Sequence, residues 1–209
     1  MVARIEHLVT SGTFALDGGV WDVDNNVWLV GDDEEVLVVD ASHDADAIEK
    51  AVAGRRLVAI VCTHAHNDHI DAAPALAERT GAPVLLHPAD RELWDRTHPG
   101  IAPDQELTDG QVLSVAGAEL TVLHTPGHSP GAVCLHAPAL GTVFTGDTLF
   151  QGGPGATGRS FSHFPTIIDS IRDRLLPLPP ETVVRTGHGD TTTVGAEAPA
   201  LADWIARGH

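Results

Sequence analysis

The sequence predicts a mixed α/β fold of the α+β type, with two sheets packed together and helices outside them. Short runs of β-branched and aliphatic residues, separated by Gly and Pro turns, occur along the whole chain and are typical of strands. Segments of helical composition lie between them in both halves. A length of 209 residues, 43% of them hydrophobic, suits one core, and no repeat or linker interrupts it. One domain over residues 1–209 is therefore expected.

The N-terminal half is expected to begin with strands and to continue with alternating helices and strands. The predicted strands cover residues 3–9, 12–16, 26–31, 35–39, 57–62 and 83–86, and the predicted helices cover 44–53, 71–79 and 89–95. Gly54 and Gly81 follow the first two helices, at positions where glycine commonly ends a helix.

The C-terminal half is richer in strands, and antiparallel pairing is expected to dominate in the chain as a whole. The predicted strands cover residues 112–115, 120–124, 132–136, 143–145 and 182–185, and the predicted helices cover 165–176 and 198–206. Pro177 lies just after the first of these helices and cannot continue it.

Charge and hydropathy exclude several classes of protein. The net charge of −17 repels the phosphate backbone that supplies most nucleic-acid affinity, so no nucleic-acid partner is expected. The longest apolar runs fall far short of the roughly 20 residues that span a bilayer, so no membrane association is expected. Because the N-terminus lacks a secretory pattern, we expect a cytoplasmic protein in which Cys62 and Cys134 are free, buried thiols.

Thirteen histidines are the unusual feature of the composition, and three of them lie in the segment 63–69, THAHNDH. This segment directly follows the predicted strand 57–62. Alternate residues of an extended chain face the same way, so His64, His66 and Asp68 can converge. A turn into the next helix brings His69 alongside. Imidazole nitrogens and carboxylate oxygens are ligands that zinc accepts, and four of them in one short segment invite a second ion.

Three further ligand-type residues follow predicted strands elsewhere in the chain. His128 lies in the motif HTPGH, Asp147 in TGDTLF and His188 in GHGD. Each lies where a strand runs into a glycine turn, which is a common place for functional groups held by a rigid scaffold.

Together, these four motifs resemble those of the metallo-β-lactamase fold hydrolases, and more closely those of the glyoxalase II-like branch. The motifs THAHNDH, HTPGH, TGDTLF and GHGD stand here in the family's order, and the resemblance spans nearly the whole chain. It implies a four-layer αββα sandwich with the metals at one edge between the sheets. It also implies two sets of ligands joined by a bridging residue: His64, His66 and His128 for one metal, Asp68, His69 and His188 for the other, and Asp147 as the bridge.

The resemblance further implies two divalent metal ions, with zinc expected and iron or manganese as alternatives. The nucleophile would be a hydroxide bridging the metals, with Asp68 as the candidate catalytic side chain. A thiolate leaving group suits such a centre, because a good anion needs no separate acid. The chain has no Tyr, which some lactone-hydrolysing relatives use near the oxyanion. We therefore expect hydrolysis of a small acyl thioester, such as an S-2-hydroxyacyl thiol, to an acid and a free thiol.

Four more residues are candidates for supporting or substrate-binding roles. Asp40 could hydrogen-bond a ligand histidine or cap the helix that begins near residue 44. His124 is expected to pack near the site without binding metal, whereas Arg159 and His163 lie in a loop where related enzymes shape the substrate pocket. The remaining histidines are interpreted as ordinary surface or core residues: His7, His43, His87, His98, His136 and His209.

Other functions of the same fold remain open at this point. One is a persulfide dioxygenase with a single iron, and another is a lactone or β-lactam hydrolase. A third is a non-catalytic binding module. Only about one helix follows His188, whereas glyoxalase II has a helical extension that holds glutathione, so recognition of glutathione stays open as well. A monomer or a homodimer is expected.

Overall fold

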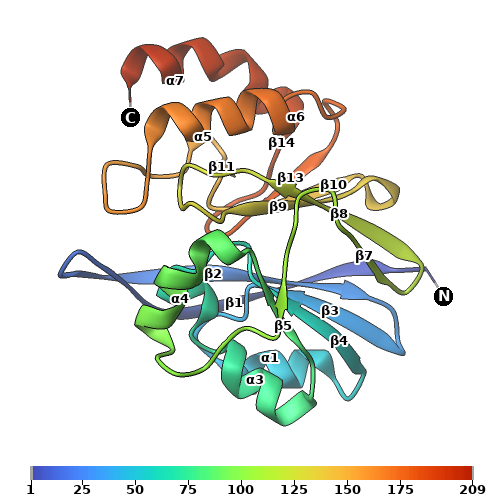
Figure 1. Cartoon of the computed structure of the whole chain (residues 1–209). Coiled ribbons are helices and arrows are strands. Elements are labelled where there is room, and N and C mark those ends of the chain that lie inside the picture. Colours follow the sequence, from blue (N-terminus) through green and yellow to red (C-terminus); the bar gives the residue numbers. More distant parts are fainter. Residues whose placement is uncertain (1, 209) are drawn as a thin grey trace.

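Two six-stranded sheets pack against each other at the centre of the molecule, and helices cover the outer face of each (Figure 1). This computed structural model describes residues 2–208, so His209 lies outside the described residues. The layers follow the order helices, sheet, sheet, helices. The predicted four-layer αββα sandwich is thereby confirmed.

The first sheet has its strands in sequence order, antiparallel from β1 to β3 and parallel from β3 to β6. Its strands are β1 (Arg4–Leu16), β2 (Gly19–Gly31), β3 (Glu35–Val39), β4 (Arg56–Val61), β5 (Val84–Leu86) and β6 (Gln105–Glu106). Its outer face is covered by α1 (Ala45–Val52), α3 (Ala73–Thr80) and α4 (Arg91–Thr97). Helix α1 begins where the Asp44 carboxylate accepts a hydrogen bond from the amide of Ala47, and it buries Ile48 and Val52.

The second sheet has the order β14-β13-β10-β9-β8-β7, and only the pair β10 and β13 is parallel. Its strands are β7 (Val112–Val115), β8 (Ala118–His124), β9 (Val133–Ala137), β10 (Thr142–Gly146), β13 (Val183–Thr186) and β14 (Thr192–Thr193). Outside it lie α5 (Phe164–Ser170), continued by a π-helical turn over Ile171–Leu175, then α6 (Val194–Glu197) and α7 (Leu201–Arg207). A small ribbon of β11 (Leu149–Phe150) and β12 (Gly153–Pro154) joins β10 to α5.

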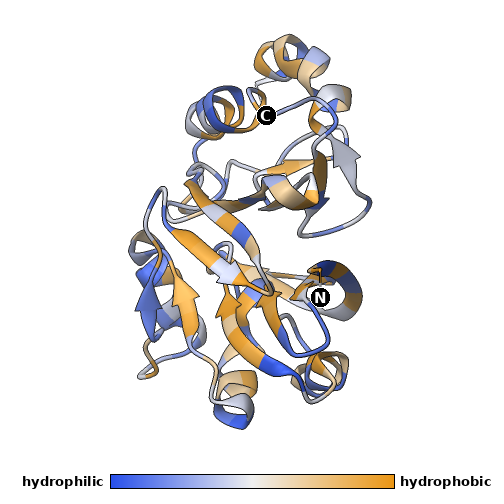
Figure 2. Ribbon diagram, turned by 90° about the vertical axis from the view of Figure 1, so that its right-hand side faces the viewer, coloured by the Kyte–Doolittle hydropathy of each residue, from blue (hydrophilic) through white to orange (hydrophobic). Residues whose placement is uncertain are grey.

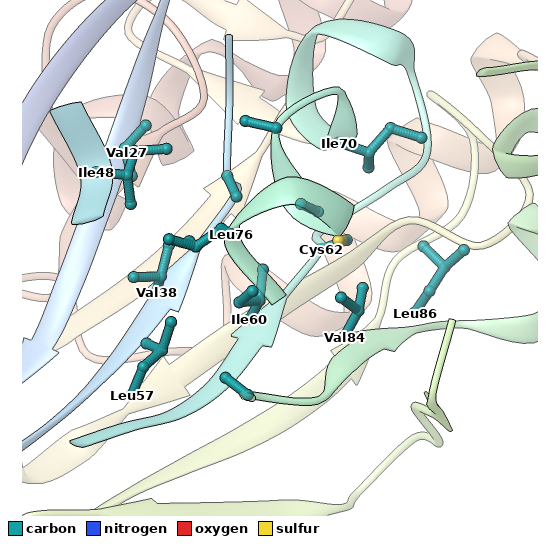
Figure 3. Packing of buried hydrophobic residues seen from close by; sticks show 14 of the residues in the cluster. Val27, Val38, Ile48, Leu57, Ile60, Cys62, Ile70, Leu76, Val84 and Leu86 are labelled. Atoms are coloured by element: carbon teal, nitrogen blue, oxygen red, sulfur yellow. The ribbon is translucent and has the colours of Figure 1, made fainter. Parts of the chain in front are cut away.

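Three apolar layers hold these elements together, and hydrophobic residues dominate the inner strands (Figure 2). Between the first sheet and its helices, side chains such as Val38, Ile48 and Leu76 interdigitate (Figure 3). Leu37 and Phe144 are among the residues that fill the space between the two sheets. A third cluster seals the second sheet against its helices. Burial of this apolar surface is the main stabilising contribution to the fold.

The N-terminal hairpin is longer and more continuous than expected. The predicted strands 3–9 and 12–16 form the single strand β1, and β2 begins at Gly19 instead of residue 26. Asp17 and Gly18, with φ of 52° and 80°, form the two-residue turn between them, as Asp-Gly does in type I′ hairpins. The hairpin projects beyond the body of the sheet, so its outer part needs no regular apolar pattern.

Further differences concern short elements. The strands β6, β11, β12 and β14 were not predicted, because each has only two residues and therefore no periodicity. The expected helix 198–206 begins as a 3₁₀ turn over Ala198–Ala200 before α7. Cys62 and Cys134 are both buried and unpaired, as expected. Within residues 2–208, the structure has no helix of the length and apolar character that crossing a bilayer requires.

Candidate metal centre

Seven histidine and aspartate residues meet at one edge of the sandwich, where strands of both sheets end. His64 and His66 follow β4, and Asp68 and His69 lie on the short helix α2 (Asn67–Ile70). The other three come from the second sheet. His128 lies in the loop between β8 and β9, Asp147 directly follows β10, and His188 follows β13. The fold thus gathers groups that are up to 124 residues apart, from 64 to 188 in the sequence.

His64, His66 and His128 form one cluster, which we call the three-imidazole group. Nδ1 of His66 lies 3.1 Å from Nε2 of His64 and 3.0 Å from Nε2 of His128. All three residues are buried. Three ring nitrogens that face one another across such short distances are the ligand set that a divalent cation requires.

Asp68, His69 and His188 form a second cluster, which we call the carboxylate group. Nε2 of His69 lies 3.2 Å from Nε2 of His188, and Oδ2 of Asp68 lies 3.4 Å and 3.3 Å from these two nitrogens. Asp147 lies between the clusters. Its carboxylate oxygens are 3.5 Å from Nε2 of His128 and 3.4 Å from Nε2 of His69.

The outer nitrogens of three of these histidines have hydrogen-bond acceptors of their own. Nδ1 of His69 donates to Oδ2 of Asp40 (3.0 Å). Nδ1 of His128 donates to the carbonyl of Ala156 (2.9 Å), and Nδ1 of His188 to the carbonyl of Asp24 (2.7 Å). These acceptors hold a proton on the outer nitrogen, so Nε2 of each ring faces the centre, where it can bind a cation once it carries no proton.

Several buried polar atoms of the site have no hydrogen-bond partner within residues 2–208. They are Oδ1 of Asp68, Oδ1 of Asp147 and Nε2 of His66. Buried polar atoms are nearly always paired, so the two unpaired carboxylate oxygens indicate a site for positive charge. The carboxylate oxygens, together with the converging imidazoles, fit divalent metal ions.

The two clusters differ in their protonation. Burial lowers the pKa of His66 to about 3 and that of His64 well below its usual range. Burial also disfavours a charge on His188, but the nearby carboxylates of Asp147 and Asp68 outweigh it and raise its pKa to about 10. For His69 the carboxylates likewise outweigh burial, and its pKa lies well above the usual range.

The carboxylates respond in the opposite direction. Burial opposes ionisation of Asp68, but the neighbouring His69 and His188 outweigh it and hold the pKa of this carboxyl at about 2. The pKa of Asp147 is likewise well below its usual range, because His188 and His69 outweigh the effect of burial. In the carboxylate group, Asp68 is therefore negatively charged and His69 and His188 are positively charged, whereas His64 and His66 are neutral.

Two buried aspartates hold the loops that carry the ligands. Asp40 accepts hydrogen bonds from the amide (2.7 Å) and the hydroxyl (2.8 Å) of Thr63, besides its bond to His69. Helix α1 is capped by Asp44, so of the two roles considered for Asp40 the structure has the hydrogen bond to a ligand histidine.

Asp90, which the sequence analysis did not single out, connects the two loops of the three-imidazole group. Its carboxylate accepts from the amide of Ala65 (2.9 Å), the hydroxyl of Ser129 (2.7 Å) and the amide of Gly131. Burial raises the pKa of Asp90, against these hydrogen bonds. The signal that could have found it is an aspartate just after the strand that follows the ligand segment.

Strand β2 holds the loop that carries His188. The amide of Asn26 donates to the carbonyl of Gly187 (2.7 Å), and the Asn26 side chain donates to the carbonyls of Thr186 and Gly189. At Gly187 a β-carbon would collide with Oδ1 of Asp147 and the ring of His69. Glycine at this position of the GHGD motif therefore allows the loop to approach the centre closely.

A cleft of about 240 Å³ opens over the centre. Its floor includes His66, Asp68, His128, Asp147 and His188. One wall is apolar and comes from the N-terminal hairpin, through Phe14, Leu16, Trp21 and Val23. This wall was not predicted, because nothing in the sequence shows that the hairpin lies over a site formed by residues 64–188.

The loop 156–162 forms another part of the rim, where Arg159 meets the hairpin wall. The Arg159 side chain is exposed, and its guanidinium carbon lies 3.9 Å from the centroid of the Trp21 ring. This geometry is typical of a cation–π contact. Arg159 thus lines the cleft, as expected for a substrate-binding candidate.

Two other candidates lie away from the cleft. His163 precedes α5, where its Nδ1 lies 2.8 Å from the hydroxyl of Thr166, and it is not among the residues that line the cleft. Nε2 of His124 donates to the carbonyl of Pro130 (2.9 Å), and its ring stacks on His87 with centroids 4.1 Å apart. His124 therefore braces the loop that carries His128 by packing.

His43 was interpreted as an ordinary surface or core histidine, and the structure shows it as a core residue whose contacts reach the carboxylate group. Its buried ring lies 2.8 Å from Oδ1 of Asn25, whose side-chain nitrogen donates to Oδ2 of Asp68 (3.0 Å). Asn25 was not singled out either. The contact joins residues from three separate segments, so sequence spacing gave no indication of it.

Comparison with known proteins agrees with this geometry. The sequence profile described as "Metallo-beta-lactamase superfamily" matches residues 20–188. The hydroxyacylglutathione hydrolase GloC of Haemophilus influenzae is 32% identical over 82% of this chain and 89% of its own length.

Two solved structures are similar along nearly their whole length. The crystal structure of TTHA1623 in a di-iron-bound form is 34% identical, with a TM-score of 0.74, and covers 90% of this chain and 96% of its own. That of BLEG-1, a B3 metallo-beta-lactamase, is 30% identical, with a TM-score of 0.77, and covers 91% and 97%. The sandwich, the His/Asp clusters that indicate divalent metal ions, and these relatives show that the chain belongs to the metallo-β-lactamase superfamily of metal-dependent hydrolases.

Proposed function

We propose that this protein hydrolyses small acyl thioesters at a centre of two divalent cations. The observation that carries the proposal is the convergence of seven ligand-type side chains in two clusters with a shared carboxylate, five of which form the floor of one cleft. The three-imidazole group would hold one cation and the carboxylate group the other, with Asp147 between them. When bound, two such cations supply an activated water as nucleophile and polarise the substrate carbonyl.

The protein's own residues define what enters the cleft. Phe14 and Trp21 offer an apolar wall for an acyl chain or for the carbon skeleton of a thiol. Arg159 is a cation on the rim beside this wall and would pair with a carboxylate of the substrate. A thiolate leaves as an anion, so the centre needs no general acid for the departing sulfur. The relationship to GloC, a hydroxyacylglutathione hydrolase, supports an S-2-hydroxyacyl thiol as the substrate type.

The experiment that tests this proposal compares substrate classes on one preparation of metal-loaded protein. Rates with an S-2-hydroxyacyl thioester, a lactone, a β-lactam and a phosphodiester are measured under identical conditions. We expect kcat/KM to be largest for the thioester. Turnover of the β-lactam or the lactone at an equal or higher rate would contradict the assignment. The β-lactam belongs in this set because BLEG-1 is a B3 metallo-beta-lactamase.

Elemental analysis of the protein as purified tests the metal content. We propose zinc, with iron as the alternative that the di-iron form of TTHA1623 favours. Two cations per chain are expected. One iron per chain, together with oxygen consumption in the presence of a persulfide, would instead indicate a mononuclear oxygenase. A protein that takes up no cation when zinc is supplied would be a binding module.

A further inference from the structure

Asn25 is buried beside the carboxylate group and contacts it directly. Its side-chain nitrogen donates to Oδ2 of Asp68 (3.0 Å) and lies 3.3 Å from Nε2 of His69. An asparagine side chain can turn over and exchange its oxygen with its nitrogen. In the turned orientation its oxygen would face the Asp68 carboxylate, so the position of the Asp68 side chain depends on which orientation Asn25 keeps.

His43 supports this orientation from the other side of Asn25. Its Nε2 lies 2.8 Å from Oδ1 of Asn25, and its Nδ1 lies 3.0 Å from Oδ2 of Asp71. The amide of His43 also donates to Oδ1 of Asp71 (2.6 Å). The Asp68 carboxylate can only accept hydrogen bonds, so the Asn25 nitrogen faces it, and Oδ1 of Asn25 is left to accept from Nε2 of His43.

Two backbone features adapt the chain to this contact. His43 adopts a left-handed conformation (φ 58°), which a non-glycine residue rarely does. On β1, a β-carbon at Gly12 would overlap the His43 ring, so glycine at this position leaves room for the imidazole. Strain and a close approach at the same side chain indicate that the position of His43 is fixed by its surroundings.

We propose that Asp71, His43 and Asn25 form a positioning chain that holds Asp68 ready for the second cation. The inference rests on the proposed two-cation centre. None of the three residues binds the cation. They act through Asp68, and the three-imidazole group has no corresponding contact with them among the described hydrogen bonds.

The positioning chain is tested by titrating metal-free protein with Co²⁺ and following the visible absorption of the bound ion. The variants are Asn25→Ala and His43→Asn, since asparagine tolerates the left-handed backbone but is too short to reach Asn25. We expect the first equivalent to bind as in the wild type. The second should bind about tenfold or more weakly, with altered absorption bands. His98→Asn is the matched control, because His98 donates to the carbonyl of Ile70 (2.9 Å) on the same helix α2 without touching Asn25.

A second set of variants avoids dependence on one substitution. Gly12→Ala displaces the His43 ring and should weaken the second equivalent in the wild-type background. In the His43→Ala background, where the ring is absent, the same change should have no further effect on Co²⁺ binding. Additive losses would show that Gly12 does not act through His43 and would contradict the chain.

The outcomes separate the two proposals. Wild-type protein that binds two Co²⁺ ions, with the second alone weakened in both variants, supports the positioning chain. Unchanged affinity in the variants, or equal weakening of both equivalents, overturns it and leaves the two-cation centre intact. Wild-type protein that does not bind two ions overturns the centre itself, and the positioning chain with it.

Discussion

The two ligand clusters of the centre lie side by side but differ in charge. Burial depresses the pKa of His64 and His66, so these imidazoles are neutral and have lone pairs ready for a cation. In the carboxylate group, the pKa values of His69 and His188 are raised by the adjacent aspartates. His69 and His188 therefore carry protons that a cation would have to displace. Binding at the first cluster is thus governed by geometry, whereas binding at the second is a competition with protons.

The largest effect is expected from removing the carboxylate that the two clusters share. Asp147 approaches His128 on one side and His69 and His188 on the other. We expect Asp147→Ala to weaken both cations and to abolish hydrolysis, because neither cluster retains a bridging charge. Zinc content after dialysis, determined by elemental analysis, measures this. Loss of a single equivalent would assign Asp147 to one cluster only.

Single ligand substitutions should separate the clusters. His66→Gln removes a nitrogen from the three-imidazole group, and His69→Gln removes one from the carboxylate group. Each variant should retain one cation per chain where the wild type holds two, and both should lose activity. Isothermal titration with Zn²⁺ distinguishes them through the affinity that remains. His136→Gln serves as control, because this histidine lies on β9 outside both clusters.

The dependence on pH should distinguish the two equivalents. Because the pKa of His188 is about 10, a cation must displace its proton at neutral pH. The affinity for the second equivalent should therefore rise about tenfold per pH unit for each proton displaced as the pH increases from 7 to 9. The first equivalent should change much less, since the pKa of His66 is about 3. Zn²⁺ titrations in buffers of different ionisation enthalpy count the protons released. An affinity for the second Zn²⁺ that does not change with pH would contradict this assignment.

The smallest effect is expected from the aspartates that hold the loops. Asp90→Asn leaves one acceptor where Ala65, Ser129 and Gly131 now donate, and Asp40→Asn similarly disturbs Thr63 and His69. Each should lower the free energy of unfolding of the metal-free protein by about 1–3 kcal/mol, measured by urea denaturation. Asp44→Asn, which preserves the cap of α1, should change it little. Equal loss in all three would indicate a nonspecific effect.

Local strand and helix patterns predicted two packed sheets with helices outside, whereas the four-layer sandwich and the grouping of the seven ligand-type residues followed from the resemblance that four short motifs carry. Strands of four or more residues have a periodicity that can be recognised, and His128 and His188 stand in short motifs at strand ends. The two-residue strands have no such pattern. Asn25, His43 and Asp90 contact residues 18 to 43 positions away in the sequence, and no spacing rule relates them. Their roles follow from tertiary contacts that only the folded chain shows.

In the proposed function, the long β1–β2 hairpin contributes to binding of the substrate, whereas the two clusters beneath it would hold the cations. Its outer part, with Phe14 and Trp21, meets Arg159 over the cleft, and the amide of Ser160 donates to Asp17 at its turn (3.0 Å). No ligand of the two clusters comes from residues 14–23 or from the loop 156–162. We expect changes in these two segments to alter what enters the cleft while the seven ligand-type residues beneath it stay in place, with the exception of Ala156, whose carbonyl accepts a hydrogen bond from His128.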